Sequence, residues 1–251
     1  MAAHGRRTGR PTPEGGAFVD KPVEAYTHPD ANPYLTAHRE FGRPLVPAGD
    51  LQAHRGRMAE LFGRDAPLVL EIGSGNGEFM VEWARRNPDV NVLGVEIRFK
   101  RTVLCARKIR AAGVEHVLIA RYHAAFLRDL FGEGELVGIL VNHPDPWPKE
   151  RHERNRLISR WFLEDVAYFL RPGGFLRIKS DFEPNCGRVA DLLDKGPEGE
   201  PLPALPLKIT GRSDDVNAKG APWADDVMTN YQGKMLRKGV PVHAIEVVRT
   251  G

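Results

Sequence analysis

Short apolar runs alternate with helix-like segments over most of this chain, and that alternation restricts the possible folds more than any other feature. Runs with the character of strands occupy residues 68–72, 90–97, 116–122, 136–142, 175–181 and 241–249, with a further one near 207–210. Segments with helical spacing lie at 78–86, 100–113, 155–170 and 187–195. Strands that alternate with helices form a mostly parallel sheet covered on both faces. The sequence therefore predicts one α/β domain from residue 51 to 251.

Residues 1–50 differ from the rest in composition. They contain six glycines and seven prolines and show no sustained hydrophobic period, which is typical of an extended or disordered arm. We therefore expect an N-terminal arm over residues 1–50, joined to the domain by a short helix at 51–63.

The whole-chain composition excludes several classes of protein. Thirty-six Lys and Arg against 33 Asp and Glu give a net charge of +3, and 41% of the residues are hydrophobic. These values exclude a polycation and a wholly disordered chain. The two cysteines are too few for a disulfide framework or a thiolate zinc site. No apolar run approaches the ~20 residues of a membrane span, and none follows the N-terminal arginines as in a signal peptide. We expect a cytoplasmic protein.

A glycine-rich turn, Gly73-Ser-Gly75-Asn-Gly77, directly follows the first strand of the domain. Glycines at alternate positions allow the backbone to turn tightly and to approach a ligand closely. A dinucleotide fingerprint requires G-x-G-x-x-G, whereas the third glycine here comes one residue early. Glu78 follows it, and a pyrophosphate would be repelled by that carboxylate.

Two acids flank the glycine turn. Glu71 precedes it and suits a cationic ligand, and Glu96 ends the next strand, 19 residues after Gly77. Such folds place an acceptor for ribose hydroxyls at that second position. The pair therefore predicts a nucleoside with a positively charged amino-acid tail, S-adenosyl-L-methionine (SAM). A nicotinamide dinucleotide is the alternative.

A second constellation follows the strand at 136–142, in the sequence NHPDPWPKERHERNR. Two prolines bracket Asp145 and stiffen the chain at a strand's carboxyl end, where such sheets bind ligands. Trp147 offers a stacking face. Phosphate-seeking cations complete the group: Lys149, Arg151, Arg154 and Arg156. A basic stretch can also be a solvated helix face, but an aromatic, a rigid acid and four cations this close together favour contact with RNA.

Together, the segments LEIGSGNGEF, LGVEI, PDPWPKERHERNRL and SDFEP resemble the bacterial tRNA (guanine-N7-)-methyltransferases, the TrmB family. The resemblance runs from about Leu68 to Asp194, with a weaker match at 229–232. It implies a Rossmann-like, SAM-dependent class I methyltransferase with a mostly parallel seven-stranded sheet and helices on both faces. It also implies methyl transfer from SAM to N7 of the variable-loop guanosine 46 of tRNA. The partner is then tRNA, no metal is needed, and a monomer and a homodimer both remain open.

The resemblance assigns roles to individual residues. Those at the cofactor site are Glu71, Gly73, Gly75, Gly77, Glu96, His123 and Asp145. Asp145 is also implied to be catalytic. Those at the substrate site are Lys149, Asp181, Thr229 and Gln232.

The chain departs from the family pattern at three places. His123 stands where the family commonly has Asp or Asn, and Asn142-His143 precedes Asp145 where aromatic residues are usual. Gln232 replaces the final Glu of a T-x-x-E motif. These departures leave two alternatives open: a methyltransferase-like RNA-binding protein, and a paralogue that acts on a different RNA guanosine.

Guanine N7 carries an exposed lone pair, so methyl transfer to it requires alignment and electrostatic stabilisation but no prior removal of a proton. Asp181, together with Asp145, is expected to accept from the N1–H and amino edge of guanine, since carboxylates only accept. The competing interpretation of Asp181 is a cap on the helix that follows it.

Overall fold

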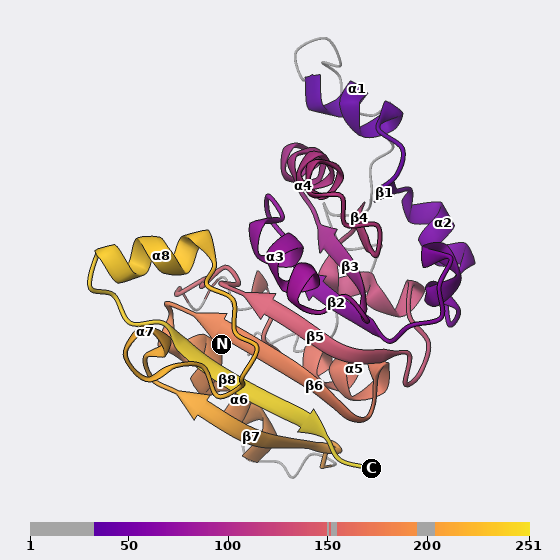
Figure 1. Ribbon diagram of the computed structural model, residues 1–251. Coiled ribbons are helices and arrows are strands. Elements are labelled where there is room, and N and C mark those ends of the chain that lie inside the picture. The colour runs from indigo at the N-terminus through magenta and orange to yellow at the C-terminus, as the bar shows by residue number, and fades with distance from the viewer. Residues whose placement is uncertain (1–32, 150, 152–154, 195–203) are drawn as a thin grey trace, which may run out of the picture.

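The computed structural model describes residues 33–149, 151, 155–194 and 204–251. An eight-stranded sheet with the order β1-β4-β3-β2-β5-β6-β8-β7 forms its centre (Figure 1). The strands are β1 (Leu45–Val46), β2 (Leu68–Ile72), β3 (Asn91–Glu96), β4 (Val117–Arg121), β5 (Leu136–Asn142), β6 (Leu170–Ser180), β7 (Leu207–Ser213) and β8 (His243–Arg249). Neighbours from β1 through β6 are parallel. β8 is antiparallel to both β6 and β7.

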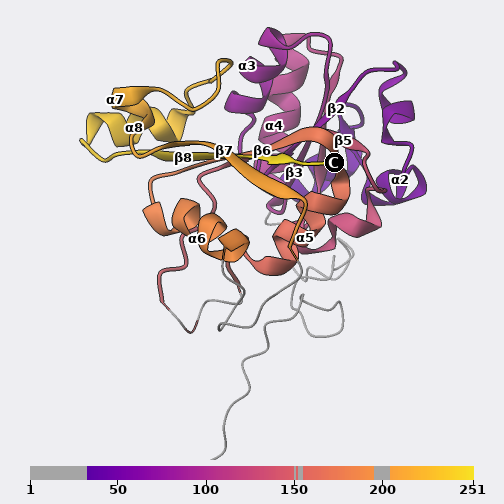
Figure 2. The ribbon, with the colours of Figure 1, turned by 90° about the horizontal axis from the view of Figure 1, so that it is seen from below.

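Helices cover both faces of the sheet, with α3 and α4 on one side and α5 and α6 on the other (Figure 2). The α-helices are α1 (Pro33–Glu40), α2 (Ala48–Ala53), α3 (Glu78–Arg86), α4 (Phe99–Ala112), α5 (Arg160–Phe169), α6 (Glu183–Asp194), α7 (Val216–Lys219) and α8 (Asn230–Arg237). The 3-10 helices η4 (Met58–Phe62) and η5 (Ala124–Asp129) lie among the described residues as well. A large apolar cluster fills each side of the sheet, which is why the central strands read as nearly continuous apolar runs. No helix in the described ranges combines the length and apolarity needed to cross a membrane.

The predicted class of fold, α/β with a mostly parallel sheet, is confirmed, with eight strands instead of seven. The additional strand is β1, which pairs with β4 through Leu45 and Val46. Without β1, the order is that of a doubly wound sheet into which the antiparallel β8 has been inserted between β6 and β7.

Residues 33–50 differ from the expected arm. They contain α1, β1 and the beginning of α2, and β1 belongs to the sheet. Arg110 of α4 holds this segment, because its guanidinium donates to the Phe41 and Arg43 carbonyls at 2.8 and 2.7 Å. The high glycine and proline content thus did not prevent packing. The first 32 residues of the expected arm lie outside the described part.

One helix begins later than its hydrophobic period indicates. The pattern predicted a helix over 155–170, whereas α5 starts at Arg160. Ser159 is its N-cap, and the Ser159 hydroxyl accepts from the Phe162 amide at 3.4 Å. A local side-chain cap therefore decided the start of this helix.

The carboxyl ends of the parallel strands meet at one edge of the sheet, between α4 and α8 in Figure 1. β2 lies in the middle, with β3 on one side and β5 on the other. The strand order therefore runs from β2 through β3 to β4 in one direction and from β5 to β6 in the other. Open α/β sheets bind their ligands at the point where the order reverses in this way. All the loops singled out in the sequence follow strands at this edge.

Candidate functional site

The glycine turn between β2 and α3 has the tight geometry that its sequence predicts. Gly73, Gly75 and Gly77 have φ angles of 76°, 56° and 81°, in the left-handed region that favours glycine. A Cβ on Gly77 would lie 2.6 Å from the Cys105 sulfur of α4, so the third glycine lets the two helices pack closely. A Cβ on Gly73 would meet no atom within 4 Å. The first glycine therefore faces open space, in which a ligand can approach the backbone.

Glu71 is a buried acid with one oxygen left without a partner. Its side chain is on β2, and the residue is 2% exposed. The side-chain amide of Asn142 donates to Glu71 Oε1 at 3.1 Å, whereas Oε2 has no hydrogen-bond donor among the described residues. Burial raises the pKa of Glu71 to about 7, and the side chains of Asn142 and Ser74 and the Lys179 ammonium counteract that rise. An unpaired buried carboxylate oxygen is costly unless a donor arrives, and the ammonium group of SAM is such a donor.

Glu96 fastens the glycine turn to the end of β3. Its Oε2 accepts from the Gly75 amide at 3.1 Å and its Oε1 from the Arg98 amide at 2.9 Å. Each carboxylate oxygen can accept a further bond, so these contacts leave acceptor capacity for a ribose hydroxyl. Glu96 therefore shapes the turn as well as presenting an acceptor.

His123 caps η5 at the end of β4. Its Nδ1 accepts from the Ala125 amide at 3.0 Å, as an Asp or Asn side chain would in the same turn. Burial lowers the pKa of His123, which favours the neutral ring, with its proton on Nε2. An Nε2–H donates, so it complements a ring nitrogen of adenine, whereas an Asp carboxylate would accept from the adenine amino group.

The loop after β5 carries two residues in an unusual backbone conformation. His143 and Trp147 have φ angles of 50° and 40°, in the left-handed region that non-glycine residues seldom occupy. The side-chain amide of Asn185 donates to the Pro144 carbonyl at 3.2 Å. Asp145 lies between them and is exposed. In the described ranges, its carboxylate has no hydrogen bond or ion pair, so it is accessible from outside.

The predicted role of Arg156 in RNA contact is not supported. Its guanidinium donates to the Trp147 carbonyl at 2.9 Å and to the Pro148 carbonyl at 3.4 Å. Arg156 therefore holds the loop in place. Lys149 and Arg151 are exposed, and Arg154 lies outside the described residues.

Asp181 follows β6 and is the centre of a polar cluster. The His143 ring Nδ1 lies 3.4 Å from Asp181 Oδ1, and the Tyr231 hydroxyl donates to Oδ2 at 3.2 Å. The other ring nitrogen of His143, Nε2, lies 3.1 Å from the Thr229 hydroxyl oxygen. The side chain of Asp181 is 26% exposed and that of His143 8%. The cluster thus presents a partly exposed carboxylate held by side chains from two other segments.

The helix-cap interpretation of Asp181 is wrong for this structure. The Ser180 hydroxyl accepts from the Phe182 amide at 3.1 Å. Within the described residues, the Asp181 carboxylate accepts from side chains and from no amide of α6.

Thr229 and Gln232 are internal, although the resemblance implied contact with the substrate. Thr229 is the N-cap of α8, and its Oγ1 accepts from the Gln232 amide at 2.8 Å. Gln232 is 2% exposed. Its Oε1 accepts from Lys179 Nζ at 3.0 Å, and its Nε2 donates to Asn217 at 3.1 Å. The oxygen and the nitrogen of the Gln232 side-chain amide are therefore both hydrogen-bonded within the protein, and this residue stabilises the site from the interior.

Lys179 is a buried cation that lies near Glu71 and also contacts Gln232. It is 2% exposed, and its ammonium also donates to Asp226 at 2.9 Å and to the Val227 carbonyl at 2.6 Å. Burial lowers the pKa of Lys179, and the carboxylates of Asp226 and Glu71 counteract that effect. Gln232 supplies a third acceptor without adding a second negative charge.

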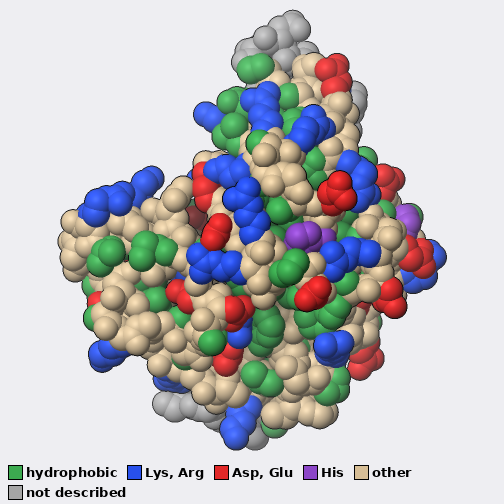
Figure 3. Space-filling view, viewed as in Figure 1, with side chains coloured by type: hydrophobic (Ala, Val, Ile, Leu, Met, Phe, Trp, Pro, Cys, Tyr) green, Lys and Arg blue, Asp and Glu red, His purple; other side chains and the backbone are tan. Residues whose placement is uncertain are grey.

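Exposed cations flank this edge on both sides. α8 contributes Lys234 and Arg237, followed by Lys238. Beside them are three exposed apolar or aromatic side chains, Met228, Tyr231 and Leu236, at 54%, 43% and 48% exposure. Figure 3 shows Lys and Arg side chains on α8 and again over α1 and α4. In α4, Lys100, Arg101 and Arg107 are exposed, whereas Lys108 pairs with Glu78.

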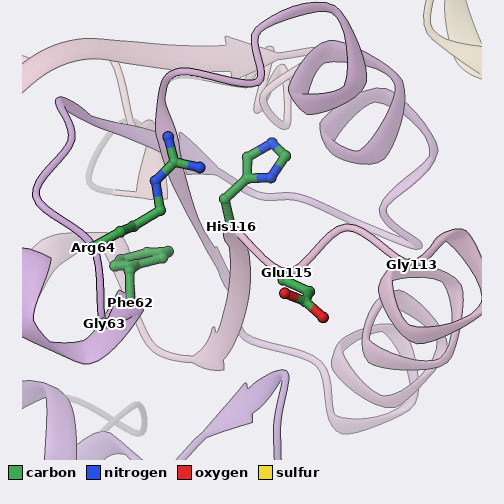
Figure 4. A pocket seen from close by; sticks show the side chains of 6 residues that line it. All are labelled: Phe62, Gly63, Arg64, Gly113, Glu115 and His116. Atoms are coloured by element: carbon green, nitrogen blue, oxygen red, sulfur yellow. The ribbon is translucent and has the colours of Figure 1, made fainter.

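A surface cavity of about 410 Å³ lies elsewhere, between η4 and the end of α4 (Figure 4). Its lining includes Arg64 and His116, which precede β2 and β4. It therefore opens at the amino ends of the strands, away from the acids described above.

Sequence patterns missed several residues of the site. Asn142, His143, Tyr231 and Lys179 drew no prediction of a role, although two of them are the departures before Asp145. Asn142, His143 and Lys179 gave a signal as polar residues at the carboxyl ends of β5 and β6. Their partners, however, are distant in sequence: Asn142 donates to Glu71 of β2, and His143 and Lys179 contact residues 226–232.

Comparisons with known proteins agree with this geometry. Residues 65–244 match the model of a family described as "Putative methyltransferase". A tRNA (guanine-N(7)-)-methyltransferase of Geobacillus kaustophilus is 35% identical over 204 residues, covering 80% of this chain and 87% of that protein. A protein of the same name from Cereibacter sphaeroides is 35% identical over 197 residues, covering 77% and 74%. The crystal structure of the 16S rRNA methyltransferase KamB superposes with a TM-score of 0.54 at 19% identity, covering 78% of this chain and 93% of that one.

A doubly wound sheet with an inserted antiparallel strand, a glycine turn and two acids at adjacent strand ends define a class I SAM-dependent methyltransferase. SAM is the methyl donor of this class, and the unpaired oxygen of Glu71 fits its cationic tail. Within that class, the chain belongs to the tRNA (guanine-N7-)-methyltransferase family.

Proposed function

We propose that this protein transfers the methyl group of SAM to N7 of a guanosine in tRNA, and that the guanosine lies in the variable loop. The observation that carries the proposal is the pairing of two acids at one sheet edge. Glu71 is buried and lacks a donor on one oxygen, whereas Asp181 is partly exposed and already oriented. One suits a cationic cofactor tail and the other a base edge that donates.

The proposed chemistry requires positioning and charge stabilisation. SAM supplies an electrophilic methyl group on a sulfonium. As N7 takes up the methyl group, the purine becomes cationic and its N1–H more acidic. The hydrogen bonds from N1–H and from the amino group to a protein carboxylate are therefore stronger in the transition state than in the ground state. We assign this acceptor to Asp181 and place Asp145, which is exposed at the adjoining strand end, beside the reacting atoms.

Labelled methyl transfer tests the proposal. Purified protein with methyl-labelled SAM and unmodified bulk tRNA is expected to place label on guanosine N7, and digestion with nucleoside mapping identifies the position. Label at a guanosine outside the variable loop would indicate a paralogue with a shifted target. No incorporation into tRNA, together with intact tRNA binding, would favour an RNA-binding protein without this activity. A tRNA substrate is consistent with a cytoplasmic location.

The tRNA is expected to lie across the cations that flank the edge. Each phosphate contact contributes roughly 0.7–0.9 to the slope of log affinity against log salt. Replacing Lys234, Arg237 and Lys238 together by Ala should therefore reduce the slope by about 2 if all three contact phosphates. Filter binding or fluorescence titration at several salt concentrations measures the slope.

The control is Arg171→Ala, since Arg171 is exposed at the amino end of β6. This variant is expected to keep the wild-type slope. An unchanged slope in the triple variant would make the α8 cations a solvated face and leave α4 and Lys149 as the RNA surface.

A further inference from the structure

His143 is a buried side chain that contacts Asp181 and two residues at the start of α8. Its side chain is 8% exposed and lies between Asp181 on one ring nitrogen and Thr229 on the other. The Tyr231 ring lies against it, with centroids 4.7 Å apart. Its backbone amide donates to the Lys179 carbonyl at 2.7 Å, which fixes the start of the loop after β5.

The partners of the ring determine which nitrogen carries the proton. Asp181 Oδ1 can only accept, so Nδ1, 3.4 Å away, must donate. Burial lowers the pKa of His143, and the neutral ring then has a bare Nε2. The Thr229 hydroxyl is 3.1 Å from Nε2 and can donate to it. The same hydroxyl oxygen accepts from the Gln232 amide at 2.8 Å, so all three groups are satisfied at once.

We propose that His143 is a positioning residue for Asp181. Its Nδ1–H donates to one carboxylate oxygen while the Tyr231 hydroxyl donates to the other, so the remaining lone pairs point outward to the base. This inference rests on the proposed function, because it concerns the acid assigned to the guanine edge. His143 takes no proton from the substrate, since N7 has none to give.

The left-handed backbone at residue 143 is compatible with this role. His and Asn are among the non-glycine residues that adopt a positive φ most readily, whereas bulky aromatic residues do so rarely. The φ of 50° therefore limits the useful substitutions at this position. Asn keeps the conformation and places its amide near the position of Nδ1, whereas the longer Gln reaches the position of Nε2.

The first test is spectroscopic and does not depend on activity. ¹⁵N NMR of histidine-labelled protein is expected to show the His143 ring protonated on Nδ1, the less common neutral tautomer. Replacing Asp181 by Asn, whose oxygen still accepts, should retain this tautomer, whereas Asp181→Ala should shift it toward Nε2–H. Protonation of His143 on Nε2 in the wild-type protein would overturn the proposal, whatever the protein methylates.

The second test is a double-mutant cycle on methyl transfer to tRNA at saturating SAM. We expect His143→Gln to lower kcat at least tenfold and His143→Asn to stay within about threefold of wild type. In an Asp181→Asn background, His143→Gln should have little further effect, because the residue it positions has been altered. Equal losses in both backgrounds would show a general structural role and overturn the proposal. Absence of methyl transfer by wild-type protein would instead refute the proposed function, and the tautomer would still decide whether His143 holds Asp181.

Discussion

Replacing Glu71 by Gln is expected to weaken SAM binding by at least tenfold while making the free protein more stable. Gln keeps the size and the acceptor for Asn142 but removes the charge that a cationic tail requires, and a hydrogen bond between charged groups contributes about 1.5–3 kcal/mol. Isothermal titration calorimetry measures the change in affinity. Glu82→Gln is the matched control, because Glu82 is a partly exposed acid of α3 that pairs with Arg86.

The gain in stability should depend on pH. Because burial raises the pKa of Glu71 from 4.5 to about 7, ionisation of this group destabilises the folded state as pH rises. The free energy of unfolding of the Gln variant should therefore match wild type near pH 4 and exceed it by roughly 3 kcal/mol above pH 7. Urea unfolding at both pH values measures the difference. Equal stability at both would show that the pKa of Glu71 is not raised.

The SAM affinity of the wild-type protein should also depend on pH. Only the ionised carboxylate pairs with an ammonium group, so affinity should fall about tenfold per pH unit below pH 7. In the Gln variant this dependence should disappear. A cofactor affinity that is independent of pH in both proteins would place the cationic tail away from Glu71.

Replacing Asp181 by Asn is expected to lower methyl transfer to tRNA at least tenfold, equivalent to about 1.4 kcal/mol or more. Asn keeps the size and one acceptor oxygen but presents an NH₂ group where guanine also donates. The loss should be mainly in kcat, because the carboxylate opposes a positive charge that develops in the transition state. SAM affinity and melting temperature should change little. Methyl transfer by folded protein at saturating SAM measures the effect.

Asp191→Asn is the matched control for Asp181, since Asp191 is an exposed acid of α6. It should transfer methyl groups at the wild-type rate. If Asp181→Asn did so as well, Asp145 would be the remaining candidate for the guanine-facing acid.

The periodic parts of the fold could be predicted from the sequence. Buried parallel strands are continuous apolar runs, and the segments 68–72 and 136–142 correspond to β2 and β5. β1 was missed, because two residues carry no period. α5 begins five residues late, because a hydroxyl cap sets its start. Residue propensity and hydrophobic period therefore located the longer strands and helices, whereas local hydrogen bonds determine where each of them begins and ends.

The site divides in the same way. Glu71 lies just before the glycine turn, and Glu96 ends the next strand, whose carboxyl end meets that of β2 at the same edge, so their proximity was predictable. The cluster at Asp181 was not, because His143 and Tyr231 join it from segments 38 and 50 residues away. The side chains of Thr229 and Gln232 were expected at the substrate and proved to be internal, since a motif gives the residue types but not the direction in which they point.

Because β8 lies between β6 and β7 yet follows both in the sequence, β7 has no neighbour in the sheet until β8 has been made. A growing chain that has passed residue 142 already contains β2 to β5 and both acids of the glycine turn. At ribosomal rates of about 5–20 residues per second, β8 follows roughly 5–20 s later. From the time each is made until β8 is added, β6 and β7 each present an unpaired edge, the feature through which nascent chains aggregate. Maturation of this chain on the ribosome should therefore proceed from β2–β5 to β6–β8, with the later part the more dependent on chaperones.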